Sequence, residues 1–332
     1  MNGRGGMMML VDAKAFLAKR YSSNVERVSP LGQGEWSTAY AFRRDGADLV
    51  IRFGTLEEDF QKDRLAARFA SPALPIPKIV EIGEAAAGFY AISERATGMY
   101  LDDLNEGQMR ALLPSLFAAL DAARLADCSS SSGYGIWAAD GDAPHGSWRA
   151  ALLDIANDRP GNRTHGWRER LKASLSGVEP FDTALELLRG LADALPEERH
   201  LIHSDLLNRN VLVVDNRISA VIDWGSAMYG DFVYDMAWFC FWAPWYPAWR
   251  GIDFRTEAER HYAAIGLNVP HLAERLRACQ IHIGLDSMAY CAFKGEERWP
   301  MLEDVAARTL MMATGDTDAV YGVRRRAALG DP

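Results

Sequence analysis

Residues 203–213 read His-Ser-Asp-Leu-Leu-Asn-Arg-Asn-Val-Leu-Val, and the run Ile222-Asp223-Trp224 follows shortly after them. Between the two, a pair of short apolar segments flanks an Asp-Asn dipeptide. This dipeptide is typical of a tight turn, so the segments are predicted to pair as a hairpin. Such a hairpin would place Asn210 and Asp223 side by side at its open end. Asp205 lies on the loop that leads into it, so three oxygen-bearing side chains are expected to converge.

These three side chains match the needs of phosphoryl transfer, in which a protein mainly positions the reactants and stabilises charge. A carboxylate near the acceptor hydroxyl orients it and can take its proton, and Asp205 fits that role. Magnesium is a hard ion that prefers oxygen ligands, and Asn210 and Asp223 offer an amide oxygen and a carboxylate. The alternative for the whole set is a solvated turn rich in Asp and Asn.

The spacing His-x-Asp-x-x-x-x-Asn followed by Ile-Asp-Trp resembles the aminoglycoside phosphotransferase family, relatives of the protein kinases. Residues 71–84 are similar to the family's linker from helix C to the next strand. Residues 230–237, Gly-Asp-Phe-Val-Tyr-Asp-Met-Ala, are similar to its Gly-Asp-x-x-Tyr-Asp-Leu-Ala segment. The resemblance covers most of the chain and looks closest to the hygromycin B phosphotransferase branch. The stretches that carry this closer likeness are residues 73–84, 221–234 and 238–245.

The resemblance implies a role for each residue of the catalytic segment. Asp205 would be the catalytic base, and Asn210 and Asp223 would hold Mg²⁺. Asp235 would brace the catalytic loop from below through hydrogen bonds to its backbone. His203 would hold the backbone near the metal-binding strand; as an alternative general base it is not needed, because Asp205 already supplies that function.

The pattern of the remaining sequence and the resemblance together predict an α+β chain with a bilobal, protein-kinase-like fold. The small N-lobe is expected to be an antiparallel sheet with helices, and the C-lobe to be mainly helical. Near residue 97 the sequence pattern changes from one typical of short strands to one that is mainly helical. This change divides the chain into an N-lobe, residues 1–96, and a C-lobe, residues 97–332, which is expected to carry the catalytic loop and the acceptor pocket. The elements expected in the N-lobe are helices at about 11–21 and 56–70 and strands at about 27–31, 37–43, 48–53, 78–82 and 88–93.

A glycine-rich loop between the first two strands, residues 32–38, is expected to cover the phosphates of a nucleotide. Its backbone N–H groups, or the hydroxyls of Ser37 and Thr38, would contact the phosphates. The two glycines of the loop, Gly32 and Gly34, make it a tight turn.

Arg52 occupies the place where kinases usually carry a phosphate-binding lysine. Its planar guanidinium keeps the charge and suits a bidentate phosphate contact. Asp63, on the following helix, is the first choice for its acidic partner. The upstream alternatives on that helix are Glu57, Glu58 and Asp59.

The segment Ile92-Ser93-Glu94-Arg95-Ala96 is expected to be the hinge between the lobes, where an adenine would bind backbone groups. Ile92 is predicted to lie against the purine, with Ser93, Glu94 and Ala96 around it. ATP is the expected donor, with GTP as an open alternative, and Mg²⁺ is the expected metal.

The acceptor is expected to be a cationic small molecule. The chain carries 36 Lys and Arg against 45 Asp and Glu, a formal net charge of −9 that attracts cations and disfavours a broad nucleic-acid-binding face. An aminoglycoside needs carboxylates for its ammonium groups and aromatic rings for its sugars, and the candidates are Asp231, Glu296, Trp242 and Trp245. A role in fixing the loop is an equal alternative for Asp231, and the core face of a buried helix is the alternative for the aromatic cluster.

The leading interpretation is therefore an ATP-dependent kinase that phosphorylates a hydroxyl of an aminocyclitol antibiotic, hygromycin B-like, and confers resistance. A housekeeping kinase of the same family, acting on a choline-like, amino acid or sugar acceptor, is one alternative, and a catalytically dead nucleotide-binding module is another. No apolar run approaches the ~20 residues of a membrane span. The protein is predicted to be cytoplasmic, without a membrane partner, and a monomer or weak dimer.

Overall fold

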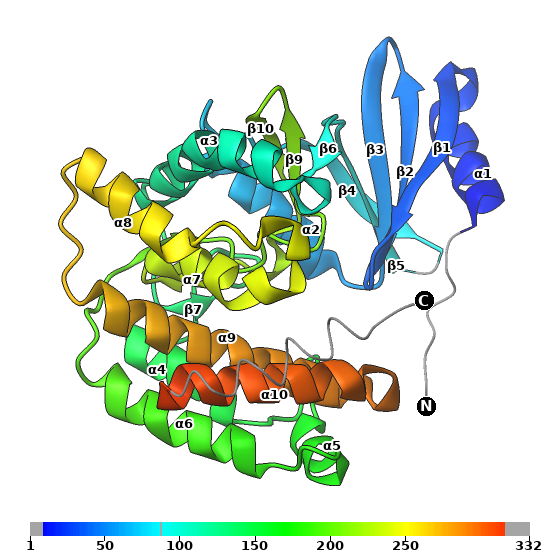
Figure 1. Cartoon of the computed structure of the whole chain (residues 1–332). Helices are drawn as coiled ribbons and strands as arrows, with labels where there is room; N and C mark the ends of the chain where they lie inside the picture. The colour runs from blue at the N-terminus through cyan, green and yellow to red at the C-terminus, as the bar shows by residue number, and fades with distance from the viewer. Residues whose placement is uncertain (1–8, 87, 316–332) are drawn as a thin grey trace.

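The computed structural model describes residues 9–86 and 88–315, which form two lobes of different character (Figure 1). The smaller lobe is an antiparallel sheet with two helices, and the larger is mainly helical, so the predicted α+β, bilobal architecture is confirmed. The elements of the small lobe are α1 (Leu10–Tyr21), β1 (Val25–Gln33), β2 (Ser37–Arg44), β3 (Ala47–Gly54), α2 (Glu57–Ala66), β4 (Ile79–Ala85) and β5 (Gly88–Glu94).

The five strands of the small lobe are ordered β1-β2-β3-β5-β4, and every neighbouring pair is antiparallel. The β2–β3 hairpin turns at Asp45-Gly46, where φ is 50° and 83°. Two successive left-handed residues match the twist of a two-residue hairpin, and an Asp-Gly pair is a sequence that favours this turn.

Strand alternation assigns the side chains of this sheet to two faces. Ile51 pairs with Ile92 across β3 and β5, and both pack on the face that α1 covers. The next pair, Arg52 and Ala91, therefore points to the opposite face. That second face carries α2, whose Phe60 packs against Ala91.

Helix α2 ends where the sequence offers it no continuation. It stops at Ala66, and a 3₁₀ turn, Ala67–Phe69, completes the helical stretch. Prolines follow at positions 72, 75 and 77, and proline cannot donate the backbone hydrogen bond that a helix needs. The chain then returns to the sheet as β4.

The large lobe is built around one central helix, α9 (Leu272–Lys294), which packs against four other helices. Figure 1 shows α9 and α10 stacked beside α6, and the C-terminal end of α9 reaching toward the small lobe. The helices of this lobe are α3 (Glu106–Arg124), α4 (Trp148–Leu153), α5 (Trp167–Ala173), α6 (Glu179–Ala192), α7 (Val233–Trp242), α8 (Phe254–Ala264), α9 and α10 (Trp299–Thr314).

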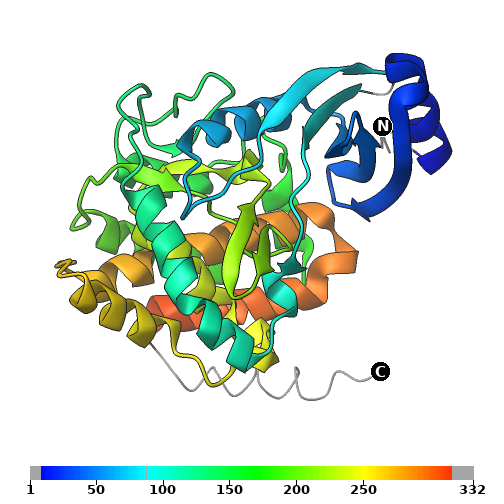
Figure 2. The same cartoon turned by 90° about the horizontal axis from the view of Figure 1, so that it is seen from above.

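Two small three-stranded sheets interrupt the helices and carry the catalytic segment. Their strands are β6 (Met99–Tyr100), β7 (Gly135–Ile136), β8 (His200–Ile202), β9 (Val211–Val214), β10 (Arg217–Val221) and β11 (Met228–Gly230), in the orders β10-β9-β6 and β7-β11-β8. Residues 203–210 run from β8 of one sheet to β9 of the other. Figure 2 shows this yellow-green region in the middle of the molecule, with the blue to cyan sheet of the small lobe to one side.

Among the described residues, no helix combines the length and the apolar character that crossing a lipid bilayer requires.

Candidate active site

The catalytic loop, residues 203–210, is held at its start by a buried carboxylate. Asp235, in the first turn of α7, accepts hydrogen bonds from the backbone N–H groups of His203 at 2.9 Å and Ser204 at 2.7 Å. Ser204 has a φ of 63°, a conformation that is costly without glycine unless its surroundings hold it. Burial raises the pKa of Asp235 to about 6, although the two N–H groups favour its ionised form. The brace that the sequence predicted is therefore present.

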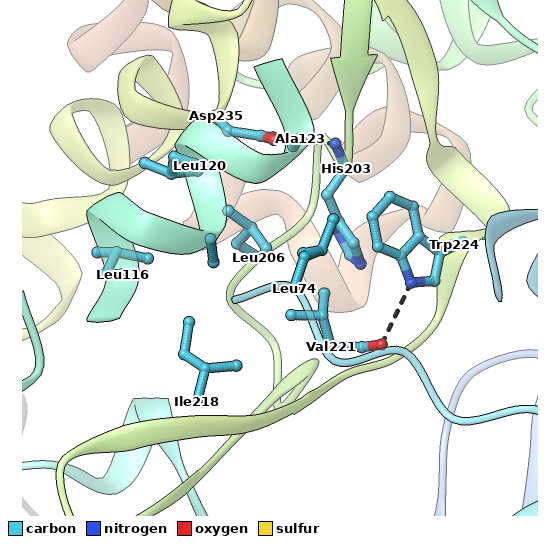
Figure 3. Close-up of a pocket in the computed structure, with 11 residues that line it drawn as sticks. Leu74, Leu116, Leu120, Ala123, His203, Leu206, Ile218, Val221, Trp224 and Asp235 are labelled. Atoms are coloured by element: carbon cyan, nitrogen blue, oxygen red, sulfur yellow. Dashed lines mark hydrogen bonds between the residues drawn. The ribbon is translucent and has the colours of Figure 1, made fainter. Parts of the chain in front are cut away.

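His203 lies beneath the loop and uses both ring nitrogens for structure. Its Nε2 lies 2.9 Å from the carbonyl oxygen of Ile222, and its Nδ1 accepts the N–H of Asp205 at 3.2 Å. Burial lowers the pKa of His203 to about 4, which keeps the ring neutral. Figure 3 shows this ring beside the indole of Trp224, with centroids 4.7 Å apart. His203 thus ties the loop to the strand before Asp223, and its nitrogens are not available to act as a base.

Asp205 is half-buried, and two amides fix its carboxylate. Asn208 Nδ2 donates to Asp205 Oδ1 at 2.7 Å, and Asn210 Nδ2 donates to Asp205 Oδ2 at 3.1 Å and to its backbone oxygen at 2.8 Å. Burial raises the pKa of Asp205 to about 7, and the nearby carboxylate of Asp223 adds to the rise. A carboxylate with a pKa near neutrality is a better proton acceptor than an ordinary aspartate.

Asn210 and Asp223 fit the expected magnesium site. The backbone N–H of Ile222 donates to the backbone carbonyl oxygen of Asn210 at 2.9 Å, and this bond sets Asp223 beside the start of β9. The amide nitrogen of Asn210 is taken by Asp205, so its Oδ1 remains to face a cation. Asp223 is exposed, yet neighbouring atoms limit its solvation. This desolvation raises its pKa, and the nearby carboxylate of Asp63 raises it further.

Among the described residues, no three His, Cys, Asp or Glu side chains gather into a metal site of their own. An amide and a carboxylate are too few ligands for Mg²⁺, which takes six oxygens and commonly completes its shell with substrate phosphates and water. The donor set therefore suits a metal that arrives with a nucleotide.

The nucleotide side begins with an ion pair between Arg52 on β3 and Asp63 on α2. Asp63 was the first choice from the sequence, and the alternatives are engaged elsewhere: Asp59 pairs with Arg163 and Glu58 with Lys62. The second oxygen of Asp63 accepts the backbone N–H of Trp224 at 2.8 Å. One buried carboxylate thus connects the sheet of the small lobe to the segment that carries Asp223.

The glycine-rich loop is a tight turn whose tip contacts the large lobe. The N–H of Gly34 donates to the oxygen of Ser37 at 2.9 Å, which closes the turn. Glu35 forms an ion pair with Lys294 at the end of α9. The ring of Trp36 lies 5.7 Å from Lys294 Nζ and 5.8 Å from the guanidinium carbon of Arg163, within the range of cation–π contact. These contacts tie the tip of the loop to the large lobe.

Replacing Lys294 by methionine is expected to raise the KM for ATP by about two- to fivefold, because partly exposed ion pairs contribute up to roughly 1 kcal/mol. Steady-state kinetics at saturating acceptor measures the change. Lys172→Met, which removes the exposed pair with Glu169 on α5, is the matched control and should leave KM unchanged. An unaltered KM in the Lys294 variant would show that the contact does not hold the loop.

The structure corrects the prediction for one residue of the expected hinge, Ile92. Ile92 is 1% exposed and packs in the core between the sheet and α1, on the face away from Arg52 and Asp63. It cannot lie against a purine held on the Arg52 face. Ala39 and Ala91, which flank Arg52 in the neighbouring strands, are the small residues on that face. Of the other predicted hinge residues, Ser93 and Ala96 are half-buried and Glu94 is exposed.

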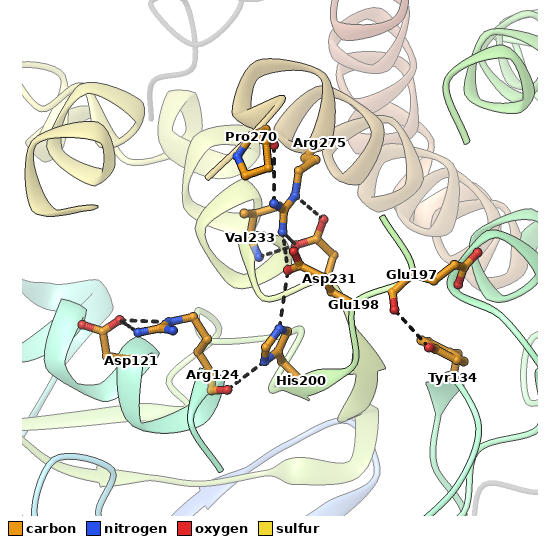
Figure 4. Close-up of polar contacts among 10 residues, drawn as sticks. All are labelled: Asp121, Arg124, Tyr134, Glu197, Glu198, His200, Asp231, Val233, Pro270 and Arg275. Carbon is orange, nitrogen blue, oxygen red and sulfur yellow. Dashed lines mark hydrogen bonds and ion pairs between the residues drawn. The ribbon is translucent and has the colours of Figure 1, made fainter. Parts of the chain in front are cut away.

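Asp231, predicted as an acceptor contact, is fully buried, so the loop-fixing alternative describes it better. Its two oxygens accept from Nε and Nη2 of Arg275 at 2.8 and 2.7 Å, and Oδ1 also accepts the N–H of Val233 at 3.1 Å. Figure 4 shows the guanidinium of Arg275, on α9, facing the neighbouring carboxylates of Asp231 and Glu198. Because Arg275 donates hydrogen bonds to both oxygens of Asp231, the carboxylate of Asp231 is not presented to a ligand.

The other predicted acceptor residues are accessible. Trp242, the last residue of α7, and Trp245, in the 3₁₀ turn after it, are half-buried and pack against the core of the large lobe, with ring centroids 4.9 Å apart. Glu296 is exposed in the turn before α10. Asp286, on α9, is exposed as well. Neighbouring atoms nevertheless limit the solvation of its carboxylate, and this desolvation raises the pKa of Asp286 to about 6. These residues are open to a ligand, but no described contact brings them together into one pocket.

A small cavity lies behind the catalytic loop, and it is mostly apolar (Figure 3). His203 and Asp235 are the polar residues among those that line it. The cavity belongs to the packing between α3 and the loop, and its lining suits neither a nucleotide nor a polycation. Its lining residues are Leu74, Leu116, Ala119, Leu120, Ala123, His203, Leu206, Ile218, Val221, Trp224 and Asp235.

Sequence reasoning missed Asp102, which contacts the catalytic loop, and Tyr246, which contacts Asp102. Asp102, in the 3₁₀ turn Leu101–Asp103, accepts hydrogen bonds from the backbone of Asn208 and Arg209, and Tyr246 donates to the same carboxylate. Both lie far from the loop in sequence and neither belongs to a recognisable motif, so no local signal pointed to them.

Known proteins share this architecture. A family model described as the phosphotransferase enzyme family matches residues 27–275. The hygromycin-B 4-O-kinase of Escherichia coli is 36% identical over 275 residues, which is 82% of this chain and 76% of that protein.

Solved structures agree with the sequence relatives. The crystal structure of the aminoglycoside phosphotransferase APH(4)-Ia matches with a TM-score of 0.79 at 32% identity, covering 92% of this chain and 99% of that one. A thermostable mutant of APH(4)-Ia in ternary complex with AMP-PNP and hygromycin B matches with a TM-score of 0.78 at 32% identity, covering 90% and 97%. By its fold, its sequence and the match over most of its length, the chain belongs to the phosphotransferase enzyme family.

Proposed function

We propose that the protein is an ATP-dependent O-phosphotransferase that acts on a hydroxyl of a hygromycin B-like aminocyclitol antibiotic and confers resistance to it. One observation carries the proposal. Asp205, Asn210 and Asp223 converge beside the Arg52–Asp63 ion pair, in a chain 36% identical to a hygromycin-B kinase. Kinase chemistry requires a base, a metal site and a phosphate clamp in this arrangement.

In the proposed reaction, Asp205 accepts a hydrogen bond from the acceptor hydroxyl, orients its oxygen toward the γ-phosphorus and takes its proton. Asn208 and Asn210 keep the carboxylate in place through their amide groups. Arg52, oriented by Asp63, neutralises negative charge on the phosphates. Asn210 and Asp223 would hold Mg²⁺ together with the nucleotide, and the ion would supply further charge neutralisation there.

The electrostatics of the chain favour a cationic acceptor. The net charge of −9 attracts polycations, and Asp286 and Glu296 present accessible carboxylates on the large lobe. The half-buried rings of Trp242 and Trp245 offer flat apolar surfaces for sugar rings. Ammonium groups and sugar rings together are the chemistry of an aminoglycoside.

Two assays test the proposal together. Expression in a sensitive host is expected to raise the tolerated concentration of hygromycin B, and purified protein is expected to release ADP when hygromycin B is added with Mg-ATP. Other aminoglycosides, choline, amino acids and sugars form the comparison panel. ADP release with one of the latter three and not with hygromycin B would overturn the antibiotic assignment while keeping the kinase. If no compound of the panel, hygromycin B included, causes ADP release, the assignment as a kinase is itself overturned.

A further inference from the structure

We infer that Asp102 is a positioning residue for the catalytic base, acting through the far end of the catalytic loop. The inference rests on the proposed function, because it assigns a role in placing Asp205. Asp102 lies in the 3₁₀ turn Leu101–Asp103, just after the chain has passed from the small lobe to the large one. Its carboxylate is the point at which three separate segments of the large lobe meet.

Asp102 binds two successive backbone N–H groups of the loop. Oδ1 accepts from the N–H of Asn208 at 2.9 Å, and Oδ2 accepts from that of Arg209 at 3.0 Å. Both residues adopt a left-handed backbone conformation, with φ of 62° and 68°. Non-glycine residues adopt this conformation reluctantly, so two in succession need an external partner, and the carboxylate of Asp102 is that partner.

The loop conformation is transmitted directly to the base. Asn208, whose backbone Asp102 holds, donates its side-chain Nδ2 to Asp205 Oδ1 at 2.7 Å. A shift of Asn208 would therefore move or release one of the two carboxylate oxygens of Asp205. The path from Asp102 to the base consists of two hydrogen bonds and one residue.

The arrangement mirrors the brace at the start of the loop. Asp235 accepts the N–H groups of His203 and Ser204, and Asp102 accepts those of Asn208 and Arg209. Two carboxylates from different parts of the chain thus grip the loop at its two ends, with Asp205 between them.

Asp102 is itself held from a third segment. Tyr246 donates its hydroxyl to Asp102 Oδ1 at 2.9 Å, and its ring is stacked on Trp249 with centroids 4.3 Å apart. Trp249 in turn donates its indole N–H to the oxygen of Leu104 at 2.7 Å. The carboxylate therefore has a fixed direction, which a positioning role requires.

Asp103 provides a matched control within the same turn. Among the described residues it pairs with the side chain of Arg209, through Nη2 at 3.1 and 3.3 Å, and it is exposed. Removing Asp103 deletes a carboxylate from the same place in the fold without touching the backbone N–H groups of the loop.

The test compares Asp102→Ala with Asp103→Ala by steady-state kinetics, using ATP and the acceptor on which the wild-type enzyme is active. Asp102→Ala is expected to lower kcat about 10- to 100-fold, because small misplacements of reacting groups have effects of this size. The KM for ATP should stay within about twofold, since the hydrogen bonds of Asp102 within the described part of the chain go to Asn208, Arg209 and Tyr246. Asp103→Ala should leave both constants within about twofold. Equal kcat values in the two variants would overturn the inference.

A double-mutant cycle separates positioning from general stability. If Asp102 acts through Asn208, Asp102→Ala combined with Asn208→Ala should lower kcat little further than the larger single change. A fold-loss of kcat in the double variant equal to the product of the two single fold-losses would overturn the inference, because it would mean that Asp102 acts independently of Asn208. Should Asp102→Ala not fold, Asp102→Asn and Tyr246→Phe decide. Both keep the shape of the side chain and should give reduced kcat with a wild-type melting temperature, whereas wild-type kcat in both would overturn the role.

The inference and the proposed function fail separately. A wild-type enzyme that transfers phosphate to no acceptor refutes the function. An active wild type whose Asp102→Ala variant behaves like Asp103→Ala refutes only the positioning role.

Discussion

Asp205→Asn is expected to lower kcat by about 10²–10⁴-fold while nucleotide binding is retained, because the loss of a general base typically has an effect of this size. Asparagine keeps the size of the side chain and can still contact the amides of Asn208 and Asn210 after reorienting. It cannot take the proton of an acceptor hydroxyl. The loss should therefore appear in kcat, with the dissociation constant of the nucleotide close to that of the wild type.

Coupled ADP release measures kcat, and calorimetric titration with a non-hydrolysable ATP analogue measures binding. Asp215→Asn is the matched control. Asp215 is an exposed residue at the turn of the β9–β10 hairpin, so this substitution makes the same chemical change outside the site. Near-normal turnover in Asp205→Asn would disprove its assignment as the base.

Asp223→Asn is expected to weaken magnesium-dependent nucleotide binding by at least about tenfold. The change removes the charged one of the two protein ligands proposed for the metal, and disturbing even the surroundings of a metal site commonly costs 10- to 100-fold in affinity or activity. Asparagine is preferred to alanine, because Asp223 has a φ of 63° and asparagine tolerates left-handed backbone better than alanine does. The backbone is thereby preserved while the carboxylate is lost.

The measurement is nucleotide affinity with and without magnesium. With a chelator present, the wild type and Asp223→Asn should bind alike, and adding magnesium should strengthen binding in the wild type only. Asp215→Asn again serves as the control and should respond to magnesium as the wild type does. Equal strengthening in the Asp223 variant would remove Asp223 from the metal site.

Local signals in the sequence were sufficient for the hairpins and for the catalytic segment. Asp45-Gly46 and Asp215-Asn216 adopt the left-handed angles that their residue types allow, so the strands on either side pair as predicted. The placement of Asn210 near Asp223 follows from the second hairpin. Asp235 could be assigned as a brace because its segment resembles a known family motif.

Long-range packing decided what the sequence did not predict. Ile92 lies in a strand as expected, but α1 covers its face of the sheet, and nothing near Ile92 in the sequence shows which face a distant helix covers. Asp231 is buried because Arg275, on another helix, reaches it. Asp102 contacts the catalytic loop across more than one hundred residues of chain.

Asp63 and Lys62 also determine how freely α2 can move. Asp63 connects Arg52 to the N–H of Trp224, and Lys62 Nζ donates to the carbonyl oxygen of Gly225 at 3.1 Å. A swing of α2 away from the large lobe would have to break both hydrogen bonds that Asp63 and Lys62 make to that lobe. An opening of the two lobes that keeps these contacts would therefore have to carry α2 along with the large lobe.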